Sequence, residues 1–286
     1  MPTIAIHGVE LVYDDVGAGE RPLVLVHGLT GFRDDFREQL DALAGLGRTI
    51  IYDLRGHGDS ANSGDAASYT FAQLVDDLGA FLDALGVARC DLLGHSMGGM
   101  IALRFALAQP ARVASLLCMG TAARAPDRMP RASFAAAGSI ARSDGMATLA
   151  GLLRARAADE VDRPAAERRL EQEWGEAFWE RRYKRLTAMD PEAFNALVLE
   201  LIDHTPLTAR LGEIHCPTTV IVGEQDASFL APSAELAAGI RGARLVIVPD
   251  SAHSPQIENP SAWFAAVRGH LAWVRETKDQ GLKSKD

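Results

Sequence analysis

Cysteine is scarce in this chain. Only 3 of the 286 residues are cysteine, and Cys90, Cys118 and Cys216 are widely spaced, each in or beside an apolar run. They show no metal-binding spacing, which argues against a zinc site. Since free cysteine is one of the most frequently buried residue types, we expect three buried free thiols and no metal or other cofactor.

Basic residues are also in short supply. The chain has 29 lysines and arginines against 38 aspartates and glutamates, which gives a formal net charge of -9. Surfaces that bind nucleic acid or anionic membranes need clustered cations to neutralise phosphate, so this balance argues against both kinds of partner. No apolar run is long enough to span a membrane, and Met1-Pro2-Thr3-Ile4 does not open a signal sequence. We therefore expect a cytoplasmic protein, and the sequence leaves open whether it forms a homo-oligomer.

Low-complexity tracts are missing as well. With 48% hydrophobic and 23% charged residues, the composition is that of a globular enzyme. A chain of this length buries one large α/β core, or such a core with a smaller inserted unit.

Short apolar segments alternate with helical patterns along most of the chain. Two alternating segments, residues 3–7 and 11–15, predict an antiparallel hairpin at a sheet edge. Apolar runs typical of strands covered on both faces follow at residues 23–26, 49–52, 90–93, 113–119, 218–222 and 245–248. Apolar residues recur near the helical period in residues 34–46, 71–85, 97–108, 232–240 and 260–274. This alternation predicts an α/β fold with a mostly parallel sheet, helices on both faces and ligands beyond the carboxyl ends of the strands.

The interval of residues 122–206 breaks the alternation. It has no convincing strand and is rich in alanine, arginine and glutamate, with aromatic side chains interspersed. We expect an all-helical insertion between the sixth and seventh strands, with Pro164 and Pro191 at turns or first helical positions. Its aromatic residues either pack helices onto the core or face a ligand, and the sequence does not decide between the two.

The strongest motif is Gly94-His95-Ser96-Met97-Gly98, directly after a predicted strand and directly before a helix. It matches the G-x-S-x-G nucleophile elbow in the context that the pattern requires. The sharp turn strains the serine backbone and exposes its hydroxyl, while the glycines keep Cβ atoms out of the crowded flanks. Because the amino terminus of the following helix favours negative charge, we expect Ser96 to be a nucleophile.

With this motif the chain resembles the α/β-hydrolase superfamily from about residue 3 to residue 274. The resemblance implies a mostly parallel eight-stranded α/β-hydrolase sheet, and the predicted hairpin and six later strands supply that number. It also implies catalytic residues in the order serine, acid, histidine, and often a helical cap inserted after the sixth strand. It divides the chain into a core of residues 1–121 and 207–286 and a cap of residues 122–206.

The resemblance assigns the partners of Ser96. Asp226 lies just past the seventh predicted strand and His253 just past the eighth, where the family carries its acid and its base. Serine is a poor nucleophile at neutral pH and needs a base, and the imidazole needs a carboxylate to hold its tautomer. Glu224 and Asp250 compete for the role of the acid. We prefer Asp226, because Asp250 lies too close to His253 along the chain and is typical of a turn.

A second glycine-containing loop, residues 27–31, follows the third predicted strand. By the resemblance, the backbone amides of Leu29 and Met97 form an oxyanion hole, which stabilises charge on the carbonyl oxygen. The alternative is an ordinary strand-to-helix turn. Histidines near these loops are expected to support the backbone and not to carry protons: His27, His57 and His95.

These residues predict a serine hydrolase that cleaves a carboxylic ester or lactone of a small acyl substrate. A serine at position 96 argues against the dehalogenase and epoxide-hydrolase branches of the superfamily, which attack with aspartate. Thioester hydrolysis, carbon–carbon hydrolysis of ring-fission products and perhydrolase or haloperoxidase chemistry stay open, although ring-fission enzymes usually have asparagine where this chain has His95. A ligand-binding receptor on a hydrolase fold is the non-enzymatic alternative, which the intact set of catalytic residues disfavours.

Overall fold

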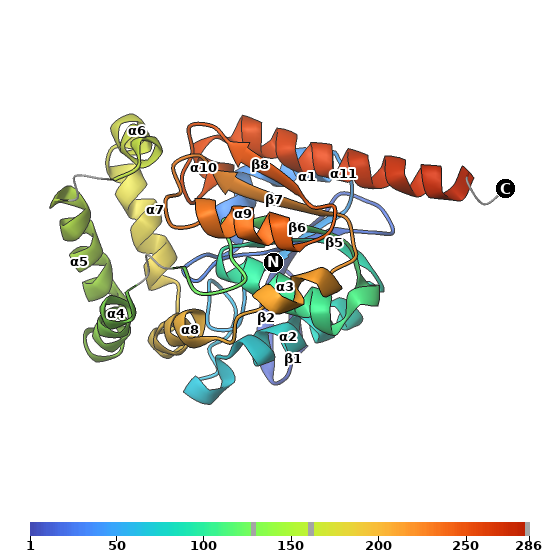
Figure 1. Cartoon of the computed structure of the whole chain (residues 1–286). Helices are drawn as coiled ribbons and strands as arrows, with labels where there is room; N and C mark the ends of the chain where they lie inside the picture. Colours follow the sequence, from blue (N-terminus) through green and yellow to red (C-terminus); the bar gives the residue numbers. More distant parts are fainter. Residues whose placement is uncertain (127–129, 160–162, 284–286) are drawn as a thin grey trace.

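A sheet of eight strands organises the computed structural model, which describes residues 1–126, 130–159 and 163–283 (Figure 1). The strands are β1 (Thr3–Ile6), β2 (Val9–Val16), β3 (Leu23–Val26), β4 (Thr49–Tyr52), β5 (Cys90–His95), β6 (Val113–Met119), β7 (Thr218–Gly223) and β8 (Arg244–Val248). Their order in the sheet is β1-β2-β4-β3-β5-β6-β7-β8. The β1–β2 and β2–β4 pairs are antiparallel and all later pairs are parallel, so the predicted fold class is confirmed.

Helices cover both faces of the sheet. Successive side chains of a strand point to opposite faces, and this divides the apolar core into two clusters. One cluster packs against α2 (Phe71–Ala84), α3 (Met97–Ala108) and α9 (Leu230–Gly239), and the other against α1 (Leu40–Ala44) and α11 (Pro260–Lys283). Burial on both faces explains why β3 and β6 consist of almost uninterrupted apolar residues.

The segment predicted as one helix over residues 34–46 has two parts. Residues Arg33–Gln39 form a 3-10 helix, η1, and only Leu40–Ala44 are α-helical. Tertiary contacts hold the first part, since the backbone N–H of Arg33 donates to Asp53 Oδ1 at 2.7 Å and the Arg33 guanidinium is buried on the same carboxylate. Apolar periodicity alone cannot distinguish the two helix types.

Within the described part of the chain, five α-helices lie between β6 and β7: α4 (Arg131–Asp144), α5 (Met146–Asp159), α6 (Ala165–Trp174), α7 (Glu176–Thr187) and α8 (Pro191–Asp203). Figure 1 shows α4 to α7, in green to yellow, gathered beside one end of the sheet. Pro164 directly precedes α6 and Pro191 opens α8, as the sequence predicted. Met189 forms an isolated bridge with His57, which ties this segment to the loop after β4.

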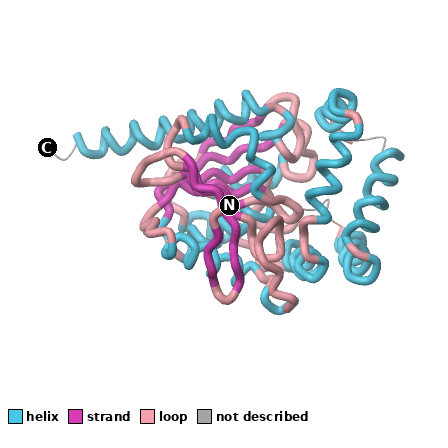
Figure 2. The backbone as a smooth tube through the Cα atoms, turned by 180° about the vertical axis from the view of Figure 1, so that it is seen from behind, coloured by secondary structure: helices cyan, strands magenta, loops and turns pink. Residues whose placement is uncertain are grey.

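The second view shows α11 running beyond the sheet towards the carboxyl terminus (Figure 2). Neither α11 nor any other described helix combines the length and apolarity that crossing a bilayer requires. The three cysteines are free. Cys90 and Cys118 are buried, but Cys216 is only partly buried, which differs from the expectation.

Candidate active site

Ser96 lies in the sharp turn between β5 and α3. Its backbone has φ 55° and ψ -119°, a conformation that non-glycine residues rarely adopt. The turn is tightly packed, because a Cβ on Gly94 would lie 2.4 Å from Gly98 O and one on Gly98 would lie 2.2 Å from Val26 O. Both flanking glycines are therefore required by the close approach of backbone.

Ser96, His253 and Asp226 form one hydrogen-bonded row. His253 Nε2 is 3.0 Å from Ser96 Oγ, and His253 Nδ1 is 2.7 Å from Asp226 Oδ2. The three residues follow β5, β8 and β7, whose carboxyl ends meet at one edge of the sheet. The ring of Phe229 stacks on the imidazole at 4.7 Å. With the proton of the neutral ring on Nδ1, Nε2 is free to accept the serine proton.

The charge of Asp226 changes the pKa of the His253 imidazole. Burial lowers the pKa of His253, but the charge and hydrogen bond of Asp226 raise it by more, so the pKa lies above its usual value. The raised pKa makes the ring a stronger proton acceptor.

Two buried side chains support the loop that carries His253. His95 Nε2 donates to the backbone carbonyl of His253 at 2.7 Å, and burial lowers the pKa of His95 well below its usual value. Glu258, the last residue of α10 (Pro255–Glu258), accepts hydrogen bonds from the backbone N–H groups of Ala252 and Ser254. Burial raises the pKa of Glu258 to about 7. Sequence reasoning anticipated the supporting role of His95 but missed Glu258.

The loop after β3 lies against Ser96, since a Cβ on Gly28 would be 3.1 Å from Ser96 Cβ. Gly28 O accepts hydrogen bonds from His27 Nδ1 at 2.8 Å and from the Gly31 amide at 3.0 Å. The peptide unit between Gly28 and Leu29 is planar and trans, so its N–H points away from its C=O. The two hydrogen bonds that hold Gly28 O therefore also fix the direction of the Leu29 N–H, opposite to that carbonyl.

The amides of Leu29 and Met97 are both free to donate. No hydrogen bond from the Leu29 amide occurs within the described residues. Met97 opens α3, where the first amides have no carbonyl partner within the helix. His57 Nε2 lies 2.6 Å from Leu29 O and holds the other side of the loop.

The two competing carboxylates lie elsewhere. Glu224 Oε2 accepts the backbone N–H of Asp250 at 3.2 Å, and Asp250 has a turn conformation with φ 49°. Neither is among the partners of His253 in the described structure. Within residues 1–126, 130–159 and 163–283, no group of three or more histidine, cysteine or carboxylate side chains is arranged to hold a metal ion.

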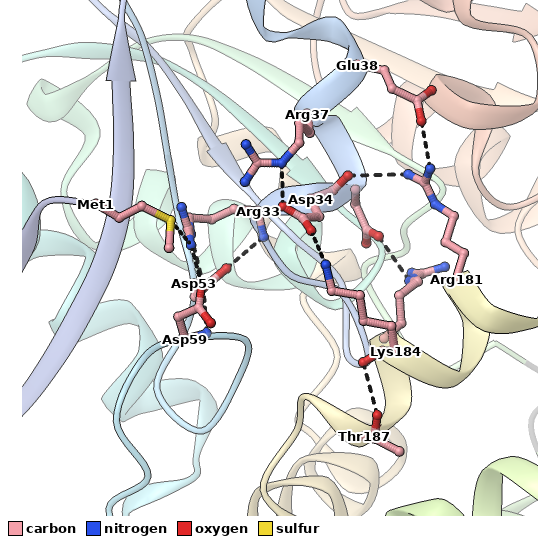
Figure 3. Close-up of polar contacts among 12 residues, drawn as sticks. Met1, Arg33, Asp34, Arg37, Glu38, Asp53, Asp59, Arg181, Lys184 and Thr187 are labelled. Carbon is pink, nitrogen blue, oxygen red and sulfur yellow. Dashed lines mark hydrogen bonds and ion pairs between the residues drawn. The ribbon is translucent and has the colours of Figure 1, made fainter. Parts of the chain in front are cut away.

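Ion pairs join α7 to η1 beside this site (Figure 3). Arg181 Nη1 is 2.9 Å from Glu38 Oε1, and Lys184 Nζ is 2.6 Å from Asp34 Oδ2. On the far side of η1, the buried Arg33 guanidinium binds Asp53 and the more exposed Asp59. The short 3-10 segment thus has a charged contact on each side.

A small cavity of about 40 Å³ lies between α6, α7 and α10. Its lining includes Ser254, the residue after His253, together with Glu258 and three arginines of α7: Arg181, Arg182 and Arg185. This concentration of cations next to the loop that carries His253 had no counterpart in the sequence predictions.

Several known proteins are similar to this chain in sequence and in fold. A family model described as alpha/beta hydrolase fold matches residues 21–260. The chain is 31% identical over 281 residues to a putative carbamate hydrolase, RutD, of Variovorax paradoxus, with 92% of this chain and 97% of the relative covered. The crystal structure of the enol-lactonase from Burkholderia xenovorans LB400 superposes with a TM-score of 0.82 and 29% identity, covering 95% of this chain and 100% of that one. A thermophilic esterase from Thermogutta terrifontis gives a TM-score of 0.80 and 28% identity, covering 95% and 97%.

Proposed function

Because the chain belongs to the α/β-hydrolase fold family, we propose that it is a serine hydrolase that cleaves a carboxylic ester or lactone. The observation that carries the proposal is the row from Ser96 Oγ through the His253 ring to Asp226, with contacts of 3.0 and 2.7 Å. A serine next to a base that is itself held by a carboxylate is the arrangement that activates a hydroxyl for attack on acyl carbon.

The reaction begins when His253 Nε2 takes the proton of Ser96 as Oγ attacks the carbonyl carbon. The amides of Leu29 and Met97 donate to the oxygen that becomes negative, and Asp226 stabilises the imidazolium without taking its proton. His253 then gives the proton to the departing alcohol oxygen, which leaves an acyl-enzyme on Ser96. A water molecule, activated by the same imidazole, releases the acid and restores the serine.

Two of the similar proteins act on the type of bond proposed for this chain. A lactone is a cyclic ester, so an enol-lactonase and an esterase act on the same linkage, and both share the fold of this chain over nearly its whole length. The proposal includes a small acyl substrate, a cytoplasmic location and no cofactor.

Residues 122–206 are proposed to act as a cap that selects the acyl group. Support comes from three attachments to the core around the site. These are the ion pairs from α7 to η1, the bridge between Met189 and His57, and the contact of α6 with α10.

Replacement of the nucleophile tests the proposal. Ser96→Ala should lose at least about a thousandfold in turnover of para-nitrophenyl esters, because oxyanion binding alone supplies only residual catalysis. The far-ultraviolet circular dichroism and melting temperature of the variant should match those of the parent. A fluorophosphonate should label the parent at Ser96 alone. Labelling at another residue, or turnover that survives in the variant, would refute the assignment.

A further inference from the structure

Arg185 reaches from α7 to the loop that carries the proposed oxyanion donor. Its side chain is 19% exposed, and its Nε lies 3.0 Å from Oδ1 of Asp35, whose side chain is 1% exposed. Asp35 Oδ2 in turn lies 2.7 Å from the point where a Cβ on Gly31 would sit. The Arg185–Asp35 pair therefore lies directly beside residues 28–31.

The same guanidinium is close enough to act on the catalytic histidine. Its positive charge opposes protonation of His27, His95 and His253 and lowers the pKa of each. Arg185 also lines the cavity that Ser254 borders. A group bound to Arg185 in this cavity would thus lie beside the loop that carries His253.

The neighbouring charges of the cavity already have partners. Arg181 binds Glu38 and the backbone carbonyl of Asp34, and Arg182 Nη1 binds Glu167 Oε2 at 2.9 Å. Glu258 accepts two backbone amides of the catalytic loop.

Arg185 differs from these residues. Its Nη1 and Nη2 have no hydrogen bond within the described residues, and its Nε contacts Asp35 without hydrogen-bond alignment. Both carboxylate oxygens of Asp35 are likewise buried without a hydrogen bond. A guanidinium with two free terminal nitrogens presents the planar edge that binds a carboxylate through two parallel hydrogen bonds.

We propose that Arg185 binds a carboxylate of the substrate, so that the preferred ester or lactone carries an acid group separate from the bond that is cleaved. This inference rests on the proposed serine hydrolase function. The cavity of about 40 Å³ has room for a compact polar head, since about 10 to 15 Å³ of such space is enough to hold one water molecule. The competing explanation is that Arg185 only neutralises Asp35 and holds α7.

Matched substrates distinguish the two explanations. The anionic probes are the mono-para-nitrophenyl esters of glutaric and adipic acids, and the neutral probes are para-nitrophenyl pentanoate and hexanoate, with Ser96→Ala as the blank for spontaneous hydrolysis. Arg185→Gln should lose at least about tenfold in kcat/KM on an anionic ester and less than about threefold on the neutral ester of the same length. Lys184→Gln removes one positive charge from the same helix, outside the cavity. It should leave the ratio of kcat/KM on the anionic ester to kcat/KM on the neutral ester unchanged at both chain lengths.

Two further measurements make the test complete. Equal losses of Arg185→Gln on both kinds of ester would overturn the proposal, as would rescue of the anionic activity by the double variant Asp35→Asn/Arg185→Gln. Calorimetric titration with glutarate reports binding without turnover. If the parent hydrolyses none of the esters, the proposed function fails on its own. In that case, glutarate that binds the parent but not Arg185→Gln would still support the anion site. Glutarate that does not bind the parent would overturn it.

Discussion

At the scale of single residues, three carboxylates around the His253 loop offer a controlled comparison. Of the three, Asp226 contacts the imidazole, at 2.7 Å, while Glu224 accepts a hydrogen bond from the backbone N–H of Asp250. Asp226→Asn should lose at least a hundredfold in kcat/KM, about 3 kcal/mol, because the amide supports the wrong imidazole tautomer. Glu224→Gln and Asp250→Asn should each lose less than about threefold. An active Asp226→Asn beside a crippled Glu224→Gln would contradict the assigned acid.

Glu258 predicts a shift in the pH profile. When ionised, its carboxylate stabilises the His253 imidazolium and raises the pKa of that ring. In the proposed mechanism activity requires the neutral ring, so kcat/KM should rise with pH through this pKa. Glu258→Gln removes the charge, lowers the pKa of His253, and should move the acidic limb of the profile down by roughly half a pH unit.

The conservative change separates charge from packing. Glutamine still offers an oxygen to the amides of Ala252 and Ser254, whereas Glu258→Ala removes the acceptor and should also lower kcat. Measuring kcat/KM from about pH 5 to pH 9 for both variants distinguishes the effect of the charge from that of the hydrogen bonds. An acidic limb that stays in place in Glu258→Gln would show that its charge does not act on His253.

At the scale of elements, His270 joins α11 to the sheet. Its Nδ1 lies 2.8 Å from Thr219 Oγ1 on β7, and its Nε2 lies 2.9 Å from Ser115 Oγ on β6. Burial and two nearby arginines lower the pKa of His270 to about 4. The unfolded chain therefore takes up this proton near pH 6.5, and the folded protein does so only near pH 4. The stability due to the neutral ring is complete above pH 6.5 and is lost as the pH falls towards 4.

His270→Gln should remove this dependence. Between pH 6.5 and pH 4 the parent should lose up to about 3 kcal/mol of unfolding free energy that the variant does not lose. Urea titrations across this range measure the difference, and His215→Gln, at an exposed histidine, is the matched control. Parallel curves for the parent and His270→Gln would contradict the buried neutral ring.

Elements with strong local patterns were predictable, and contacts across long sequence separations were not. Strands β3, β4 and β6 followed from apolar runs buried on both faces, and the turn at Ser96 followed from its glycines. The same pattern predicted β8, but Leu245 and Ile247 of that edge strand are exposed. The pairing of Arg185 with Asp35 left no local pattern, because it depends on which elements the finished fold brings together. Glu258 is only six residues from Ala252, and its hydrogen bond to the Ala252 amide depends on the exact path of the loop after β8, which no sequence pattern indicated. The catalytic roles of Ser96, Asp226 and His253 stay predictions, although their geometry suits those roles.

At the scale of the whole molecule, protection of the backbone should be uneven. Every residue of β5 and β6 is buried, whereas most side chains along α5 are exposed. Amides in buried strands exchange only on global unfolding, and sparsely packed helices open locally. Hydrogen exchange followed by mass spectrometry should find β5 and β6 slowest and α5 among the fastest helices. Equal protection of α5 and β5 would mean that the α5 region opens only together with the sheet.

The base of the proposed site comes late in the chain. Ser96 and the loop of residues 27–31 precede the five helices between β6 and β7, whereas His253 follows β8 at the far end of the sheet. A nascent polypeptide that has left the ribosome only as far as β7 holds the nucleophile and the oxyanion loop but no proton acceptor. If Ser96 and His253 have the roles proposed above, turnover cannot start before β8 has joined β7, and the chain cannot hydrolyse cellular esters during its own synthesis. In a cell-free translation, the delay between the appearance of full-length chains and of esterase activity would record the docking of the last strand.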